Sequence, residues 1–149
     1  MPFLLVFAAI LPLVDAMPTA FEVAKMPARR AVRVIRLGLP AVAFVGVADV
    51  LYLTVDELAG KLRVSPRTVR DQRKKLVRLS SENTEKLVRI ARIQSQARKV
   101  FSTDEAVAGW LRSPSPALDG TLPIDLLDTD LGAREVESVI NGMAYGNVM

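Results

Sequence analysis

The chain has 149 residues, half of them hydrophobic, and a formal net charge of +4. It contains no cysteine and no histidine, which excludes disulfides, thiol nucleophiles, most zinc sites and the usual neutral-pH general base. No clustered acid pair replaces them, so we predict a cytoplasmic protein that is not an enzyme and needs no cofactor or metal ion. The length allows one domain or two very small ones, with a real hydrophobic core.

Charge is divided unevenly along the chain. Residues 25–100 carry a net charge of +12, residues 101–149 carry −6, and the first 24 residues carry −2. A basic middle favours a polyanion partner, and the same polyanion would repel an acidic end. We therefore expect two surfaces with two partners. The alternative is a set of solvated helix faces that happen to segregate by charge.

Residues 1–34 read as an uncertain N-terminal extension. Residues 2–14 are apolar, but they are fewer than the ~20 needed for a helix to span a bilayer. A signal peptide has a positively charged segment before its apolar core, but no lysine or arginine precedes these residues. Met17 and Met26 are both plausible starts. We therefore expect no membrane partner, and we expect deletion of residues 1–25 to leave folding and binding intact.

A second apolar run extends from Leu37 to Leu53, with Pro40 near its start and Asp49 inside it. Seventeen residues with a charge are marginal for a membrane span. The run instead predicts a buried helix of a small helical domain, either within one chain or shared across a dimer interface.

Residues 35–80 have the spacing of a helix-turn-helix domain. Thr54 and Glu57 form a capping box at the start of one helix. Ser65 and Pro66 then fit the N-cap and first position of a second helix. The first helix carries apolar residues on one side (Val55, Leu58, Ala59 and Leu62), as helix-turn-helix regulators do.

The second helix divides into a basic stripe and an apolar side at about 100° per residue. Val69 and Leu76 are expected to anchor it in the domain, while Arg67 and Arg70 near its start face base edges. The candidate DNA-binding residues are Ser65, Arg67, Thr68, Arg70, Asp71, Lys74, Lys75 and Arg78, the last three as phosphate contacts.

Two positions of this motif depart from the usual pattern. Arg63 stands where the turn most often has glycine, and Gln72 stands where such helices usually bury an aliphatic side chain. The alternative to a recognition helix is a basic helix that is merely solvated.

Residues 81–101 predict a connecting helix. Ser80 and Ser81 cap it, and apolar residues at helical spacing follow from Glu82 to Phe101. A further capping box, Ser102 to Glu105, opens the next helix. That helix carries Trp110, either as a core residue or as an interface anchor.

The last forty residues predict two short helices and a tail. Turn signals at Pro114, Pro116 and Asp119-Gly120 precede Pro123, which fits the first position of a helix over Ile124–Leu127. A second helix starts at Thr129 or Asp130, with an apolar side formed by Val136, Val139 and Ile140, and a glycine-punctuated tail follows it.

This order of parts, with VFSTDEAVAGWLRSPSPALDG, TLPIDLLDTDLGAREVESVI and a terminal AYG, resembles Xre-type antitoxins of the RES–Xre toxin–antitoxin family. Their C-terminal part is called the ParS/MbcA toxin-binding domain. The resemblance covers roughly Ile35 to Met149. It implies an all-α fold in which an N-terminal helix-turn-helix domain is joined by a long helix to a small helical toxin-binding domain at residues 102–149.

The resemblance also implies a function. Members neutralise a RES-domain toxin that consumes NAD or transfers from it, and they bind their own double-stranded operator DNA, usually as homodimers within a larger toxin–antitoxin complex. The candidate toxin contacts are Leu126, Leu127, Asp130, Gly132, Arg134, Glu135, Tyr145 and Gly146, with Asn147, Val148 and Met149 nearest the toxin's active site.

Each of these candidates has an alternative interpretation. Leucines at positions such as Leu126 and Leu127 are more often core than interface, and Gly132 and Gly146 fit backbone requirements. Tyr145 and the pair Arg134 and Glu135 are stronger candidates, because aromatic and arginine side chains dominate interface energetics. For the whole chain, the alternative to an antitoxin is a stand-alone repressor whose C-terminal part only dimerises.

Overall fold

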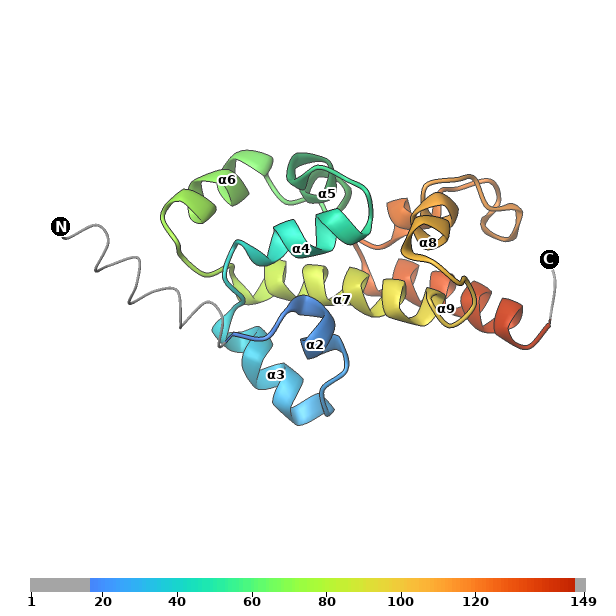
Figure 1. Cartoon of the computed structure of the whole chain (residues 1–149), viewed down its shortest axis with the longest axis horizontal. Coiled ribbons are helices and arrows are strands. Elements are labelled where there is room, and N and C mark those ends of the chain that lie inside the picture. Colours follow the sequence, from blue (N-terminus) through green and yellow to red (C-terminus); the bar gives the residue numbers. More distant parts are fainter. Residues whose placement is uncertain (1–16, 147–149) are drawn as a thin grey trace.

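The computed structural model describes residues 17–146, and its regular elements are helices. They are α2 (Ala20–Ala24), α3 (Ala28–Leu37), α4 (Ala43–Val50), α5 (Val55–Lys61), α6 (Pro66–Lys74), α7 (Ser81–Ala97), α8 (Asp104–Leu111), the 3₁₀ turns η1 (Pro116–Leu118) and η2 (Pro123–Leu126), and α9 (Asp130–Ala144). The predicted all-α fold, with the helix-turn-helix first and the acidic helices last, is confirmed (Figure 1).

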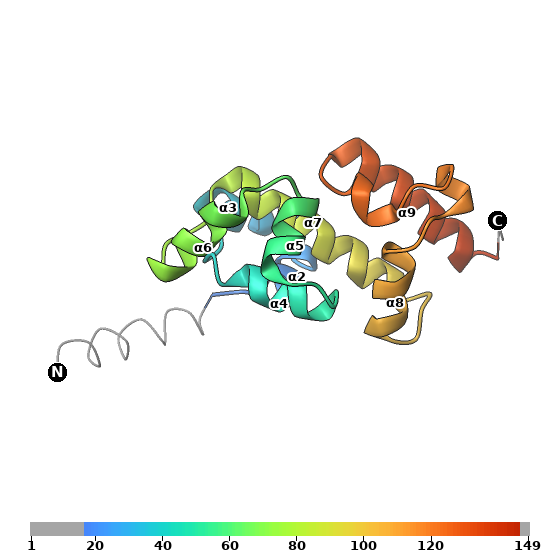
Figure 2. The same cartoon turned by 90° about the horizontal axis from the view of Figure 1, so that it is seen from above.

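Helix α7 is the central element of the fold. It contacts α2, α3 and α4 along its first part and α9 toward its other end (Figures 1 and 2). Its buried residues lie on more than one side, because Leu87, Ile90, Ala91, Ile93 and Ala97 are all fully enclosed. Ser80 caps its start, as expected, by accepting a hydrogen bond from the Asn83 amide at 3.1 Å. The helix expected as a connector is therefore the shared core of both halves.

The N-terminal helices belong to this core. Ala20 and Val23 of α2 are buried, and α2 packs directly on α7. The expectation that residues 1–25 can be deleted without loss is wrong for Ala20–Ala24, because their removal would expose the apolar surface of α7 to water. Residues 1–16 lie outside the described residues.

The apolar run from Leu37 to Leu53 is two elements rather than one helix. Helix α3 ends at Leu37, and Gly38 follows with φ 87°. A Cβ at Gly38 would clash with the carbonyl oxygen of Leu79, so the close approach requires glycine. A short bridge with hydrogen bonds from Leu79 N to Leu39 O (2.8 Å) and from Ala41 N to Val77 O (3.1 Å) breaks the helix before α4 begins.

The acidic half contains α8, η1, η2 and α9. Thr103, one residue later than expected, caps α8 through the Ala106 amide at 3.1 Å. Pro123 takes the first position of η2, and Thr129 caps α9 through the Gly132 amide at 3.1 Å. Both agree with the predicted boundaries to within one residue.

Across residues 17–146, no helix combines the length and the apolar character that a membrane crossing needs.

Candidate functional site

The turn between α5 and α6 has the local geometry that the sequence predicts. Thr54 Oγ1 accepts from the Glu57 amide at 3.1 Å, and Ser65 Oγ accepts from the Thr68 amide at 3.2 Å. Leu58 and Val69 are buried between the two helices. Arg63 takes the left-handed turn conformation, with φ 55°, at the position that usually holds glycine. The turn is therefore made at a conformational cost of about 1 kcal/mol.

The outer face of α6 carries basic side chains that are free of partners. Arg67 and Lys74 are exposed, and no hydrogen bond or ion pair within residues 17–146 engages their side chains. Thr68 and Asp71 share this exposure. Arg70 differs, because its guanidinium is paired with Asp56 of α5. A polyanion that contacts Arg70 must therefore displace a carboxylate.

The basic stripe is shorter than the sequence predicts. Helix α6 ends at Lys74, and Lys75 is its C-cap. Leu76, expected to anchor the helix, instead takes φ 55° and is 57% exposed. Arg78 also lies beyond the helix, where its Nη1 donates to Gly38 O at 3.0 Å. The expectation that Leu76 anchors the helix is wrong because the bridge between residues 77–79 and 39–41 ends the helix early. Arg78 is exposed outside the helix and stays a predicted phosphate contact.

Gln72 weakens the packing of α6 on the rest of the domain. The residue is half-buried, and its side-chain oxygen is enclosed without a hydrogen-bond partner in the described part of the chain. Such an atom costs about 1–3 kcal/mol. Helix α6 is therefore held less firmly than an aliphatic residue at this position would allow.

Helix α9 presents an exposed stripe to solvent. Leu131, Arg134, Glu135, Ser138 and the C-cap Tyr145 fall within about 100° of one another at 100° per residue, and all five are exposed. Leu131 is 76% exposed and Tyr145 is 83% exposed, more than the other large hydrophobic residues of the described chain. Leu131 was not among the predicted contacts, although its angle places it opposite the buried Ile140. A stripe with a leucine at one end and a tyrosine at the other is suited to bind another protein.

Several predicted contacts are core residues instead. Leu127 is fully buried, and Gly132 is buried where a Cβ would clash with the Leu126 carbonyl oxygen. Both therefore serve the packing of η2 on α9, and their interpretation as toxin contacts is wrong for this fold. Leu126 is half-buried, and Asp130 forms an ion pair with Arg134 at 2.9 Å.

The end of the chain is only partly covered by the structure. Gly146 is exposed with φ 75°, which suits glycine. Asn147, Val148 and Met149 lie outside the described residues.

Polar contacts with α7 fix the position of α9. Arg92 Nε of α7 bonds Glu137 Oε1 at 2.9 Å, and Arg89 Nη1 donates to the carbonyl oxygens of Leu127 (3.4 Å) and Asp128 (3.2 Å). Trp110 is half-buried, and its ring centroid lies 5.7 Å from that of Phe101, so it serves packing more than exposure. The exposed stripe of α9 is thus carried by a well-anchored helix.

Comparison with known proteins matches each half of the chain to a family of antitoxin domains. Residues 30–92 match the Antitoxin Xre-like helix-turn-helix domain, and residues 96–146 match the Antitoxin Xre/MbcA/ParS C-terminal toxin-binding domain. The chain belongs to the Xre-type antitoxins. It is also 34% identical over 77 residues to the Prs ADP-ribosylating antitoxin of Sphingobium sp. (strain YBL2), a match that covers 46% of this chain and 48% of that protein.

The two matched regions of the antitoxin correspond to its two surfaces. The helix-turn-helix region runs from α3 into α7 and includes α6, whereas the toxin-binding region runs from the last turn of α7 through α9. Three ion pairs join these regions: Lys61 Nζ to Asp125 Oδ1 (2.6 Å), Arg63 Nε to Asp128 Oδ2 (2.9 Å) and Arg92 Nε to Glu137 Oε1 (2.9 Å). Half-exposed pairs of this kind stabilise by about 1 kcal/mol or less, so α7 is the stronger link.

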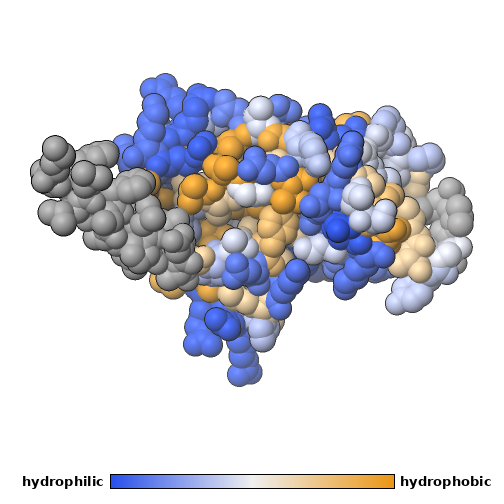
Figure 3. Space-filling view, viewed as in Figure 1, coloured by the Kyte–Doolittle hydropathy of each residue, from blue (hydrophilic) through white to orange (hydrophobic). Residues whose placement is uncertain are grey.

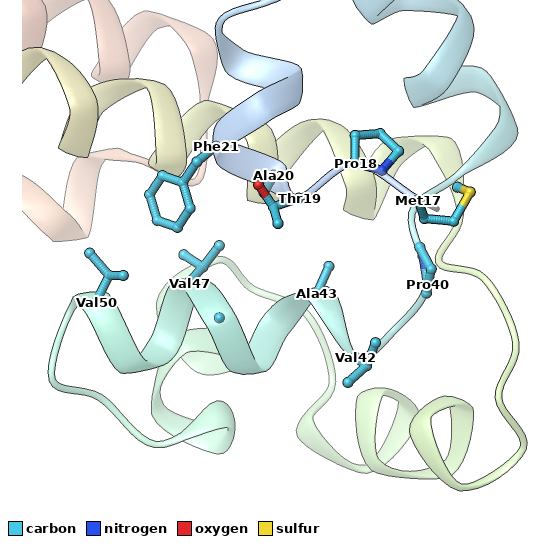
Figure 4. Close-up of a pocket in the computed structure, with 11 residues that line it drawn as sticks. Met17, Pro18, Thr19, Ala20, Phe21, Pro40, Val42, Ala43, Val47 and Val50 are labelled. Atoms are coloured by element: carbon cyan, nitrogen blue, oxygen red, sulfur yellow. The ribbon is translucent and has the colours of Figure 1, made fainter. Parts of the chain in front are cut away.

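The antitoxin also has an apolar groove of about 340 Å³ between α2 and α4 (Figure 4). Phe21, Val42, Val47 and Val50 are among its lining residues. The only hydroxyl in the lining is that of Thr19, which already caps α2. The groove therefore offers apolar contact and no catalytic group. In the described part of the antitoxin, no acidic cluster could hold a metal ion.

Proposed function

We propose that this antitoxin neutralises a RES-domain toxin that consumes NAD, and that it represses its own operator through α6. One observation carries the proposal: the stripe of α9 that exposes Leu131 and Tyr145 lies inside the matched toxin-binding region. A helix held by α7 presents this stripe already formed, so little ordering cost remains on binding. The antitoxin acts as a steric block and is not itself an enzyme.

Charge supports an NAD-binding cleft as the target. Residues 101–149 carry a net charge of −6. A cleft that holds the two phosphates of NAD is positively charged, and it attracts an acidic protein surface for the same reason. The Sphingobium relative supports the same chemistry, because its name refers to ADP-ribosylation, a reaction that uses NAD as donor. We therefore place α9 and the residues that follow it over the toxin's NAD cleft.

The DNA-binding half of the proposal depends on the free cations of α6. Arg67 lies in the first turn of α6 and Lys74 is the last residue of this helix, and both side chains are exposed. In this motif the second helix enters the major groove, and dimers bind two half-sites about one helical turn apart. We propose that the antitoxin binds its operator as a homodimer, with Arg67 at base edges and Lys74 and Lys75 at phosphates.

The test is an NAD-consumption assay with the product of the neighbouring gene. Purified antitoxin should abolish NAD loss at a stoichiometric ratio, and the two proteins should co-purify. The Leu131→Ala/Tyr145→Ala variant should fail in both respects. A neighbouring product that is harmless and never co-purifies would favour the second candidate, a stand-alone repressor whose acidic half only dimerises.

A further inference from the structure

Basic side chains without partners gather on two helices of this protein. Half of the lysines and arginines in residues 17–146 engage a carboxylate, a carbonyl oxygen or a sulfur. The cations that make no such contact lie chiefly on α6 with its cap and on α3. Those of α3 are Arg29, Arg30, Arg33 and Arg36, all exposed. Nothing in the proposed toxin or operator contacts uses this second set.

The charges of α3 oppose the stability of the helix itself. Arg29 and Arg30 occupy its first turn, where the helix dipole favours acids, and the turn contains no acid. No aspartate or glutamate lies between Glu22 and Asp49 to neutralise them. Like charges one turn apart also repel. A ligand that supplies negative charge would remove both costs.

The position of α3 separates it from α6. Helix α3 packs on α7 and α2, whereas α6 packs on α5. Figure 1 shows α6 above α7 and α3 below it, and Figure 2 shows the two at the same end of α7. Hydrophilic surface projects from the body at both places (Figure 3). A straight duplex that lies against α6 therefore leaves α3 free.

We propose that α3 is a second phosphate-binding face, which holds a separate segment of duplex DNA. Guanidinium groups pair with phosphates in a bidentate manner, and all four cations of α3 are arginines. Arg29 to Arg36 spans about 10 Å of helix. This length corresponds to roughly three phosphates of one strand.

An anionic membrane fits the same helix less well. Insertion into a bilayer surface needs a free apolar face. Among the apolar residues of α3, Ala31, Val34 and Ile35 pack against the core of the protein, whereas Val32 and Leu37 are exposed. Val32 and Leu37 lie about 140° apart around the helix, with arginines between them, so they form no continuous apolar face. The exposed side is therefore mainly charged, which suits a phosphate backbone.

The proposal extends the DNA-binding half of the proposed function, but its test does not depend on α6. Arg67→Ala/Lys74→Ala removes two of the free cations of α6, and this variant is titrated with a duplex of arbitrary sequence at increasing salt. Adding Arg29→Gln/Arg33→Gln should lower the slope of log affinity against log salt by roughly 1.8, about 0.9 per lost phosphate contact. Lys99→Gln/Arg112→Gln, in the same α6-disabled background, removes equal charge and should leave the slope unchanged.

A bead assay tests whether the two segments are separate. Protein with intact α6, bound to an immobilised operator, should capture a second, fluorescent duplex. The Arg29→Gln/Arg33→Gln variant should still bind the operator but should no longer capture the second duplex. Three results would overturn the proposal. They are an unchanged salt slope, an equal fall of the slope in the Lys99/Arg112 control, and a loss of binding to phosphatidylglycerol vesicles instead of DNA. Failure of operator binding by the wild-type protein would overturn only the proposed function.

Discussion

The recognition helix α6 and the acidic helix α9 are exposed elements of opposite construction. Helix α6 has nine residues, packs on α5, and ends early at the bridge between residues 77–79 and 39–41. Helix α9 has fifteen residues, is bonded to α7 through Arg92 and Glu137, and buries Val136 and Ile140. Free cations dominate the first face, and exposed apolar and aromatic side chains stand at both ends of the second.

This difference matches what each proposed partner demands. A phosphate backbone is recognised mainly by charge, which tolerates a loosely held helix with long side chains. A protein cleft is recognised by shape and by a few anchoring side chains, which requires a fixed platform.

The largest effect is expected on the α9 stripe. Leu131→Ala/Tyr145→Ala should weaken toxin binding on the order of 100- to 1000-fold, because truncation of a hot-spot residue costs about 2 kcal/mol or more. Isothermal titration with purified toxin measures the change. Tyr52→Ala/Leu76→Ala is the matched control, since these residues are 58% and 57% exposed on the other half. Equal losses in both variants would mean that α9 has no special role.

The packing of η2 on α9 gives the next effect. Gly132→Ala should lower the free energy of unfolding by about 1–3 kcal/mol, because the new Cβ would meet the Leu126 carbonyl oxygen. Urea denaturation measures it. Gly109→Ala, on an open face of α8, should be neutral or stabilise by about 1 kcal/mol or less. An unaffected Gly132→Ala would show that η2 is free to move away from α9.

A smaller effect is expected on the recognition helix. Arg67→Ala/Lys74→Ala should weaken operator binding and reduce its salt slope by roughly 1.8. Fluorescence anisotropy at several salt concentrations measures both quantities. The Lys99→Gln/Arg112→Gln variant carries the same charge change away from α6 and should bind like the wild type. A slope that does not move would support the merely solvated helix.

The smallest effect concerns the ion pairs between the two halves. A double-mutant cycle of Lys61→Ala and Asp125→Ala should give a coupling energy of about 1 kcal/mol or less, since both side chains are partly exposed. Ile90→Ala in α7 should cost about 2–5 kcal/mol instead. A coupling energy that rivals the loss at Ile90 would make the ion pairs, and not α7, the main link between the halves.

Local chemistry made much of this fold predictable. The caps at Thr54, Ser65, Ser80 and Thr129 act over three residues, and each was found where the sequence placed it. Contacts between distant residues could not be predicted in this way. Gly38 is required by Leu79, forty-one residues further along the chain, and the same bridge exposes Leu76.

The candidate site was predictable only in part for a related reason. Helical spacing shows which residues share a face, but it does not show what covers that face. Leu127 was therefore a candidate both for the core and for a contact, and the structure shows that it is fully buried. Leu131 was not predicted as a contact, although it lies opposite the buried Ile140 and is exposed. For α7, helical spacing predicted a helix between the two halves, but it did not show that the buried residues of this helix pack against both halves.

We infer that α6 and α9 act independently, although α7 packs against both halves of the antitoxin. The most direct measurement assays two variants, Arg67→Ala/Lys74→Ala and Leu131→Ala/Tyr145→Ala, for both toxin inhibition and operator binding. We expect each variant to lose one activity by at least about tenfold and to keep the other at the wild-type level. Comparable loss of both activities in both variants would contradict the claim.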